Sequence, residues 1–171
     1  SQILREDEQM SLMNLLYDAL QKQKKHRYLK SIELTLLYRA SDHNYKAAKF
    51  HELCDKQGAN IVVINNEYDF VFGAYASSSW GDGSSTDPEA FLFSVRPNPK
   101  VCGFRKGNEA GEYAVHKTFK DYGPLYGAGT DMWISDNCRG TESCACRAHP
   151  SHSTFDFELK DFCGGVHKES N

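Results

Sequence analysis

The sequence predicts a mainly β, α+β domain: a sandwich of two antiparallel sheets flanked by helices, with an extra helix at the N-terminus. Three observations support this fold class. The 171 residues match one domain of ordinary size. Many short apolar or alternating runs are separated by Gly, Pro, Ser, Asp and Asn. Few segments have helical periodicity, and because each sheet must bury an apolar face, short strands favour two packed layers.

Composition and charge exclude several classes of protein. The net charge of -3, from 20 basic and 23 acidic side chains, provides no field that would attract nucleic acid, so no nucleic-acid partner is expected. No run approaches the roughly 20 apolar residues that span a bilayer, so no transmembrane segment is expected. The first residues lack the basic start and apolar run of a secretory signal. We therefore expect a cytoplasmic protein with reduced cysteines, or an extracellular one if the six cysteines are bridged.

Residues 1–29 are predicted to form an amphipathic helix and a basic linker, and residues 30–171 the main domain. The apolar positions recur every three or four residues, as in a helix: Met10, Met13, Leu16, Tyr17 and Leu20. Basic residues between Lys22 and Lys30 follow, where cations favour the C-terminal end of a helix. We expect this helix to pack on its own domain, and a homodimer contact through it is the alternative.

Residues 32–38 alternate as a strand does, and a second helix is predicted after them. Ser41 and Asp42 can cap this helix, and Gly58 follows its end. Four residues fall on one face of it: Ala47, Phe50, His51 and Cys54. The spacing predicts that His51 and Cys54 are core residues.

A β-hairpin is predicted from residues 61–64 to residues 68–72. The two runs are joined at Asn65 and Asn66, and Asn tolerates the positive φ of tight hairpin turns. Further short strands are predicted in the rest of the chain, at residues 90–95, 101–104, 132–134 and 155–159.

Several motifs, in order and spacing, resemble those of a TLDc domain over about residues 30 to 163. The first half contains Leu36-Leu37-Tyr38-Arg39-Ala40-Ser41, Phe50-His51 with Cys54, Val71-Phe72-Gly73-Ala74-Tyr75, Trp80, and Asp87-Pro88-Glu89-Ala90-Phe91. The second half contains Tyr122-Gly123-Pro124, Tyr126-Gly127-Ala128-Gly129 before Asp131, and Ile134-Ser135-Asp136-Asn137-Cys138.

The resemblance implies a two-sheet sandwich and a protein-interaction module. TLDc proteins include oxidation resistance proteins, a relative of a nuclear receptor coactivator, and interferon-induced relatives. Their shared roles are protection against oxidative stress and binding to the vacuolar-type proton pump (V-ATPase), and no agreed reaction is attached to the domain. The resemblance therefore favours a non-enzymatic interaction module. The residues that match the family motifs are Tyr38, Arg39, Ser41, Phe50, His51, Cys54, Phe72, Gly73, Trp80, Phe91, Gly127, Gly129, Asp131, Ser135 and Asp136.

The chain departs from the family pattern near its C-terminal end. Typical members have glycine where Ala128 stands and histidine where Thr130 stands. The loop after Cys138 is usually rich in Asn and Ser, whereas residues 139–152 contain cysteine, histidine and arginine. These differences affect the surface through which a family member would bind.

This loop is the main candidate for cofactor or redox chemistry. Five potential zinc ligands lie close together: Cys138, Cys144, Cys146, His149 and His152. A Cys-x-Cys pair is unusual in structural zinc sites, so a zinc cofactor is not the favoured prediction. Thiols at Cys144 and Cys146 could react with oxidants, helped by nearby arginines, and this redox-active or zinc-binding loop is the second hypothesis. A third is an extracellular recognition domain with a bridge such as Cys138–Cys144 or Cys146–Cys163.

Other motifs favour structural roles. Residues 82–87 resemble part of a hard-cation loop, but the alternating ligands and distant Glu of an EF-hand are missing, and a polar surface loop is the better interpretation. Residues 122–129 could cradle an anion, yet glycines followed by a strand more often mark a tight bend. Common hydrolase, nucleotide and metalloprotease motifs do not occur.

Overall fold

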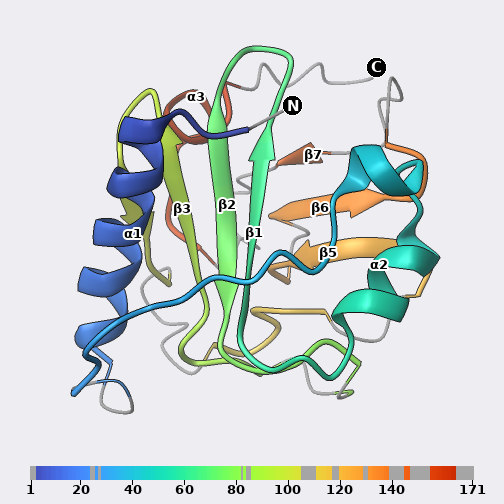
Figure 1. Ribbon diagram of the computed structural model, residues 1–171, viewed down its shortest axis with the longest axis horizontal. Helices are drawn as coiled ribbons and strands as arrows, with labels where there is room; N and C mark the ends of the chain where they lie inside the picture. Colours follow the sequence, from blue (N-terminus) through green and yellow to red (C-terminus); the bar gives the residue numbers. More distant parts are fainter. Residues whose placement is uncertain are drawn as a thin grey trace.

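Two antiparallel sheets form the framework of the protein (Figure 1). The computed structural model describes residues 3–23, 26, 28–81, 83, 86–104, 111–116, 120–128, 131–138, 145–146 and 155–164. The first sheet has the order β1-β2-β3-β4, with β1 (Asn60–Asn65), β2 (Val71–Ala76), β3 (Phe91–Arg96) and β4 (Lys100–Cys102). The second has the order β5-β6-β7, with β5 (Tyr122–Tyr126), β6 (Met132–Ser135) and β7 (Ala145–Cys146). The predicted fold class is confirmed.

The central strands β2 and β3 are buried on both faces. Alternate residues therefore enter two different cores, because successive side chains of a strand point to opposite faces. Phe72, Ala74 and Leu92 join the core that also contains Tyr126 and Met132 of the second sheet. On the other face, the residues belong to the core beneath α1: Val71, Tyr75, Phe91, Phe93 and Val95. This double burial explains why β2 and β3 read as nearly continuous apolar runs.

Helix α1 (Glu6–Gln21) packs against β3 and β4, and its buried apolar residues are Leu12, Leu16 and Leu20. The predicted helix is confirmed, but its predicted face is wrong at one end, because Met10 is 69% exposed. The buried leucines are spaced i, i+4, i+8 and define a stripe rotated from the one inferred. The proposed boundary between residues 1–29 and 30–171 stays a prediction.

Helix α2 (Ala47–Cys54) buries the four predicted residues, Ala47, Phe50, His51 and Cys54. A 3-10 helix, η2 (Ala40–His43), precedes it, and α3 (Leu159–Phe162) lies near the end of the described chain. Figure 1 shows α1 beside the first sheet and α2 on the opposite side of the molecule, close to β5 and β6.

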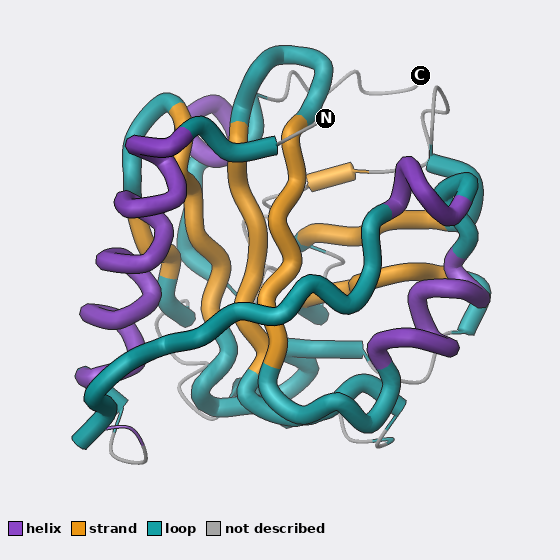
Figure 2. The backbone as a smooth tube through the Cα atoms, viewed as in Figure 1, coloured by secondary structure: helices purple, strands orange, loops and turns teal. Residues whose placement is uncertain are grey.

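Two predicted strands are absent from the part of the chain that the structure describes. Residues 29–39, which we call the strap, are extended but belong to no strand, and they run across β2 and β1 (Figure 2). Ile32 packs with the core beneath α1, whereas Leu37 and Tyr38 pack with the core between the sheets. The strap thus passes around the edge of β1. Residues 155–159 contribute only an isolated bridge between Phe155 and Phe104 before α3 begins.

The predicted hairpin is confirmed, with a longer connection than expected. β1 and β2 pair from Asn60 with Ala76 to Asn65 with Val71. Asn66 organises the turn, because its Oδ1 accepts hydrogen bonds from the backbone N–H groups of Tyr68 and Phe70. Asp69, rather than an asparagine, adopts the left-handed conformation, with φ of 61°.

Candidate functional site

Many of the family-motif residues meet where the strap, η2, α2 and the β5–β6 pair come together. We call this region the α2 corner and define it as residues 38–50 and 134–138. A series of aromatic rings leads from it into the core. Tyr38 lies edge-on to Phe50 with ring centroids 5.7 Å apart, Phe50 lies 5.4 Å from Trp80, and Trp80 lies 5.6 Å from Tyr126. Such perpendicular contacts are one of the preferred aromatic geometries, and they pack the corner against the sandwich.

Asp136, which follows β6, caps the N-terminus of α2. Lys46 at the N-cap has no side-chain oxygen to accept a helix N–H. Asp136 supplies it, because its Oδ1 accepts a hydrogen bond from the backbone N–H of Ala47 at 2.8 Å. Its Oδ2 pairs with the Lys46 ammonium at 3.3 Å. These two contacts, first the backbone hydrogen bond and then the lysine, lower the pKa of the Asp136 carboxyl.

The loop after β6 is attached to the turn before α2 by a second contact. The backbone N–H of Asn137 donates to the carbonyl oxygen of Tyr45 at 2.9 Å. Asn44 and Tyr45 have φ of 53° and 57°, a left-handed conformation that is uncommon for residues other than glycine. The contacts from Asp136 and Asn137 stabilise this turn, and strained backbone of this kind is often found at functional sites.

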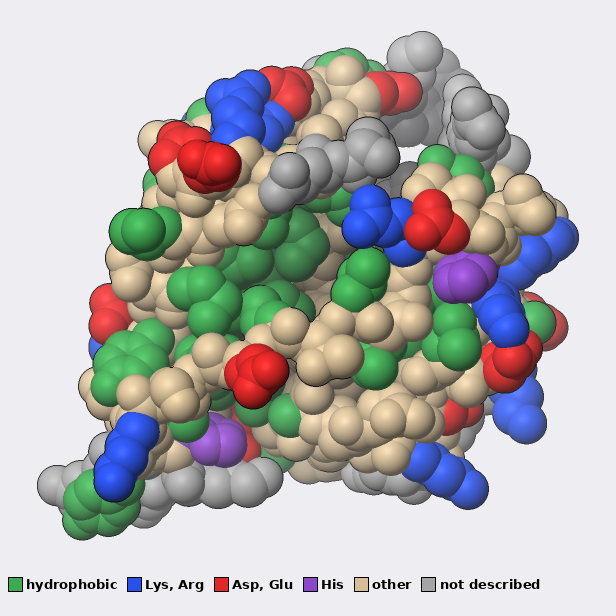
Figure 3. Space-filling model, viewed as in Figure 1, with side chains coloured by type: hydrophobic (Ala, Val, Ile, Leu, Met, Phe, Trp, Pro, Cys, Tyr) green, Lys and Arg blue, Asp and Glu red, His purple; other side chains and the backbone are tan. Residues whose placement is uncertain are grey.

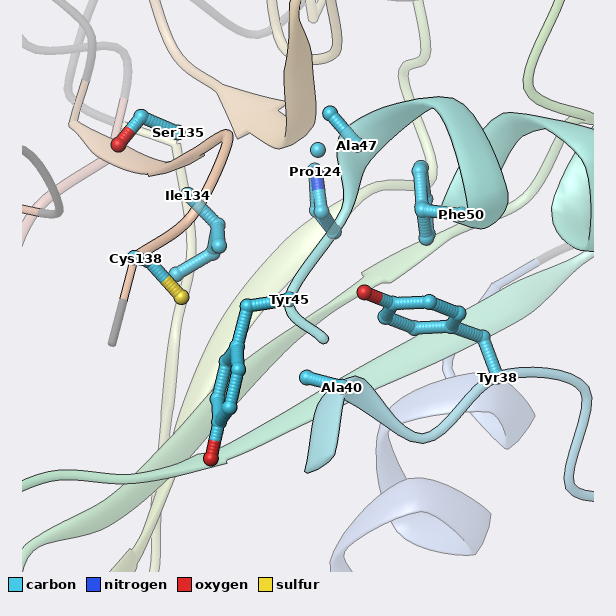
Figure 4. A pocket seen from close by; sticks show the side chains of 10 residues that line it. Tyr38, Ala40, Tyr45, Ala47, Phe50, Pro124, Ile134, Ser135 and Cys138 are labelled. Carbon is cyan, nitrogen blue, oxygen red and sulfur yellow. The ribbon is translucent and has the colours of Figure 1, made fainter. Parts of the chain in front are cut away.

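A small apolar cavity of about 30 Å³ lies inside the α2 corner (Figure 4). The tyrosines Tyr38 and Tyr45, the side chain of Ile134 and the thiol of Cys138 line it, together with Ala40, Ala47, Phe50, Gly123, Pro124 and Ser135. Pockets that hold small-molecule ligands measure roughly 300–1,000 Å³. A second cavity, near Phe157 and Phe162, measures about 10 Å³. Neither of these two described cavities has room for a substrate.

His51 connects α2 to the second sheet. Its Nδ1 lies 2.8 Å from Asp55 Oδ1, and its Nε2 lies 2.9 Å from the carbonyl oxygen of Tyr122 at the start of β5. The side chain is buried, as predicted. Because both ring nitrogens contact protein oxygens, His51 is placed to hold α2 on β5 rather than to coordinate a metal.

Two glycines of the family motifs are required by close packing. A Cβ atom at Gly73 would collide with the carbonyl oxygen of Val62 in the neighbouring strand. Gly127 has a φ of 85°, and a Cβ atom at this position would collide with the carboxylate of Asp131. Asp131 is buried and accepts a hydrogen bond from the backbone N–H of Phe155 at 3.2 Å. Gly129 lies outside the described residues.

The remaining motif residues have distinct places. Phe72 and Phe91 lie in the central strands and are buried. Arg39 forms an ion pair with Asp42 at 3.5 Å, and the exposed Ser41 hydroxyl lies 3.0 Å from the same carboxylate. Ser135, at the end of β6, is half-buried and lines the cavity.

Sequence reasoning missed the role of Asp87. This carboxylate is buried and accepts hydrogen bonds from the backbone N–H and hydroxyl of Ser77 at 2.9 and 2.6 Å, from the Ser78 hydroxyl at 3.1 Å, and from the Glu89 N–H at 3.3 Å. Asp82, the other carboxylate of that loop, lies outside the described residues. The placement of Asp before Pro and Glu was the signal that a turn is organised by this side chain.

Among the residues that the structure describes, four cysteines carry thiols: Cys54, Cys102, Cys138 and Cys163. Burial raises the pKa of both Cys54 and Cys102 to about 11, so these thiols are protonated and poorly reactive. Cys138 is half-buried at the α2 corner. A Cys138–Cys144 bridge would need Cys138, and a Cys146–Cys163 bridge would need Cys163. Both of these cysteines carry thiols in the structure.

The predicted zinc and redox residues lie mostly beyond what the structure describes. Cys144, His149 and His152 are outside the described residues, and Cys146 belongs to β7, whose backbone pairs with β6. Within the described ranges, no group of three or more His, Cys, Asp or Glu side chains is arranged to hold a metal ion.

The comparisons with known proteins identify one family. A search of curated proteins finds no match. None of the helices in the described part of the chain is long and apolar enough to cross a membrane. The model of the TLDc domain matches residues 1–162, a range that includes α1 and both sheets. The chain therefore belongs to the TLDc domain family.

Proposed function

We propose that this chain is a non-enzymatic TLDc interaction module that binds or regulates V-ATPase subunits in the cytoplasm and contributes to protection against oxidative stress. Membership of the TLDc family is the observation that carries the proposal. The module would act by presenting a rigid protein surface to the pump, and the α2 corner is the part of it where the family motifs gather.

The geometry of the α2 corner supports binding rather than catalysis. Its cavity of about 30 Å³ accommodates no more than a small apolar group. The charged side chains around it are engaged in ion pairs, Arg39 with Asp42 and Lys46 with Asp136. The half-buried tyrosines Tyr38 and Tyr45, with charged side chains around them, match the mixture of aromatic and polar residues that is typical of protein–protein interfaces.

The proposal is tested by measuring binding of the purified chain to purified V-ATPase subunits, with another TLDc domain that binds the pump as positive control. The wild-type chain is expected to bind. Lys46→Glu is expected to weaken binding about tenfold, because the new glutamate would repel the neighbouring Asp136 and would reverse a charge at the edge of the α2 corner. Lys100→Glu, which changes an exposed lysine of β4, is the matched control. Failure of the wild-type chain to bind, while the positive control binds, would refute the proposal.

A redox or zinc function of residues 138–152 is the second candidate, favoured by the half-buried Cys138 thiol at the start of that loop. Peroxide would take two electrons and two protons from a pair of thiols, giving a disulfide and two waters. Elemental analysis for zinc and a thiol count before and after peroxide treatment test it. Absence of bound zinc together with an unchanged thiol count contradicts this candidate.

A homodimer through α1 stays a prediction. It has to use the outward side of the helix, where Met10 is exposed, because Leu12, Leu16 and Leu20 already pack against the sheet. Sedimentation of the wild-type chain and of Met10→Asp tests it, and a single monomeric species at all concentrations refutes it.

A further inference from the structure

The middle of the strap is exposed, and its backbone is unpaired. The side chains from Glu33 to Leu36 are all exposed, with Leu34 at 46% and Leu36 at 68%. From residue 30 to residue 37, no hydrogen bond joins the strap to another residue that the structure describes. In Figure 3, hydrophobic side chains are exposed beside the strap, between it and α1. The strap therefore offers extended chain whose amide and carbonyl groups are available to another molecule.

The other large apolar side chains that are exposed in the described ranges, apart from Tyr28, lie on backbone of a different kind. They are Met10 in α1, Val101 in β4, Tyr122 in β5, Tyr68 and Tyr113 in hydrogen-bonded turns, and Ile3 in the bend before α1. Leu34 and Leu36 combine an exposed apolar side chain with extended and unpaired backbone.

Tyr28 provides an informative comparison. It is 86% exposed, more than either leucine of the strap. The peptide groups next to it are engaged, because the N–H of Leu29 donates to the carbonyl oxygen of His26 at 2.9 Å. The carbonyl oxygen of Leu29 accepts a hydrogen bond from the Tyr17 hydroxyl at 3.1 Å. Exposure of the side chain thus favours Tyr28, whereas freedom of the backbone favours Leu34.

We propose that the strap is a cleavage site for an endoprotease with an apolar specificity pocket, cut between Leu34 and Thr35, and that α1 stays docked as a separate subunit after the cut. Extended peptides are bound through main-chain hydrogen bonds, and side-chain pockets give specificity. In a protease, the pocket takes the residue before the bond that is cut. Water adds across this C–N bond, so that Leu34 gains a carboxylate and Thr35 an amino group. The inference goes beyond the pump proposal and does not depend on it.

The position of the cut follows from what lies on each side of the bond. Leu36 is the more exposed leucine, but Leu37, which follows it, packs against the core between the sheets. A cut after Leu36 would require Leu37 to leave that core. The bond between Leu34 and Thr35 has exposed residues on both sides, two before it and two after it. It is therefore the bond of the strap that a protease reaches with the least rearrangement.

The exposed stretch can enter a protease without unfolding of the two sheets. It is anchored by Ile32 and Leu37, and both side chains are only partly buried. Lifting the stretch between them breaks no hydrogen bond among the described residues. Local opening is easiest where few contacts and few hydrogen bonds are lost. Proteolytic nicking concentrates in exposed segments of this kind.

The contacts that hold α1 do not involve the exposed stretch. The buried leucines of α1 pack in a core with β2 and β3. Glu8 in its first turn accepts a hydrogen bond from Arg96 Nη2 at 2.8 Å. Just after its last turn, Gln23 Nε2 donates to the carbonyl oxygen of Glu89 at 2.7 Å. A cut in the strap leaves these contacts in place, but it removes the linker that keeps the effective concentration of α1 high.

The test is limited proteolysis of the full 171-residue chain with chymotrypsin, which has an apolar specificity pocket. Mass spectrometry measures the cleavage rate at each bond. Each rate is divided by the rate for the same bond in a short synthetic peptide, so that the preference of the enzyme among side chains cancels. We expect the bond between Leu34 and Thr35 to be the least protected, about tenfold less than the bond between Tyr28 and Leu29.

Substitutions in the strap locate the bond. Thr35→Pro should abolish the cut after Leu34, because proline after the bond prevents cleavage. Its ring removes an N–H that bonds to no described residue, and the extended backbone of Leu34 suits a following proline. Thr35→Val is the matched control, since it keeps the N–H and the branched shape, and it should be cut at the wild-type rate. Leu34→Asp should slow the cut about tenfold or more, because it places a charge in an apolar pocket.

Gel filtration of the cut chain tests whether α1 stays docked. At neutral pH the fragments 1–34 and 35–171 are expected to elute together and to separate only in denaturant. Leu16→Ala should release the shorter fragment at a higher protein concentration than the wild type does, because Leu16 is 1% exposed in the shared core. Met10→Ala is the control, since Met10 is 69% exposed, and it should behave as the wild type. Urea denaturation of each uncut variant confirms that it is folded.

Each other outcome overturns the inference. Weaker protection at Tyr28, or at any bond outside the strap, would show that the strap is not the preferred site. Equal cutting of Thr35→Pro and Thr35→Val would place the cut at a different bond. Separate elution of the two fragments in native buffer would refute the docked subunit. V-ATPase binding enters none of these measurements, so its failure leaves the cleavage site unaffected.

Discussion

The guanidinium of Arg96, at the end of β3, forms two hydrogen bonds with the carboxylate of Glu8 in the first turn of α1. Arg96 Nε donates to Glu8 Oε1 at 2.5 Å, and Nη2 donates to Oε2 at 2.8 Å. Glu8 also accepts a hydrogen bond from the backbone N–H of Arg5 at 2.8 Å, as the N3 residue of a capping box does. Arg96 additionally pairs with Asp69 of the β1–β2 turn. One half-buried arginine therefore joins α1, β3 and the hairpin.

This arrangement predicts how stability depends on acid. Hydrogen bonds from Arg96, followed by the one from Arg5, lower the pKa of Glu8 from 4.5 to about 2. Because the folded pKa lies below the unfolded one, the stabilisation is complete above about pH 4.5 and is lost as the pH falls towards 2. Glu8→Gln should cost about 1 to 2 kcal/mol at pH 7 and flatten the pH dependence in this range. Chemical denaturation at several pH values measures both effects, with Glu6→Gln as control. An unchanged pH profile in Glu8→Gln would contradict the role assigned to this pair.

The corrected face of α1 gives a second prediction. Leu16 is 1% exposed in the core above β3, whereas Met10 is 69% exposed. Leu16→Ala should lower the free energy of unfolding by about 2 to 4 kcal/mol, because it leaves a cavity. Met10→Ala should change it by less than about 0.5 kcal/mol. Thermal and urea denaturation of the two variants measure this difference, and equal losses would mean that the helix packs through the other face.

The sequence predicted those features that depend on neighbours along the chain. The face of α2 was correct because Ala47, Phe50, His51 and Cys54 follow one unambiguous helical spacing. The buried face of α1 was predicted incorrectly, because several apolar residues lie near Leu16 and two overlapping stripes of apolar residues fit the helical spacing. Apolar and polar residues alternate in the strap as strongly as in a strand. A strand also needs a hydrogen-bonding partner, and no local pattern in the sequence reveals that this partner is missing.

The α2 corner could be predicted only in part, for a similar reason. The motif residues were identified, but the cap of α2 was placed on Ser41 and Asp42, next to the helix in sequence. The structure uses Asp136, which is 89 positions from Ala47. Contacts across such a separation depend on how the two sheets pack, and spacing along one chain does not encode them. The burial of Asp87 was missed because a loop of Asp, Ser and Gly has the composition of an exposed one.

The cap of α2 yields a third prediction. Asp136→Ala removes the acceptor for the Ala47 N–H and should loosen the first turn of α2, whereas Asp136→Asn retains an oxygen and should preserve much of the cap. Hydrogen–deuterium exchange of the Ala47 amide measures the effect, and faster exchange is expected in the alanine variant. Asp121→Ala, a change at an exposed residue before β5, is the control. Unchanged protection of Ala47 in Asp136→Ala would show that the contact does not hold the helix.

Close packing of β1 against β2 yields a fourth prediction. A Cβ atom at Gly73 meets the carbonyl oxygen of Val62, a backbone atom that cannot move without breaking the strand pair. Gly73→Ala should therefore lower the free energy of unfolding by about 3 kcal/mol or prevent folding. Gly103→Ala is the matched control, because a Cβ atom there has no neighbour within 4 Å. Urea denaturation of both variants measures the difference, and a stable Gly73→Ala chain would contradict the register of this pair.

The cysteines provide a fifth prediction, which bears on the redox hypothesis. Cys54 and Cys102 are buried, and burial raises the pKa of each thiol to about 11. At pH 8 both are protonated and covered, so they should react with a thiol reagent only when the protein unfolds. Cys138 is half-buried at the α2 corner and should react earlier than either of them. Timed alkylation followed by peptide mass spectrometry assigns the rate of each cysteine, and adding urea serves as the unfolded reference. Rapid alkylation of Cys54 in the folded chain would contradict the burial of α2 against β5, and any thiol-based protection would then have to include this residue.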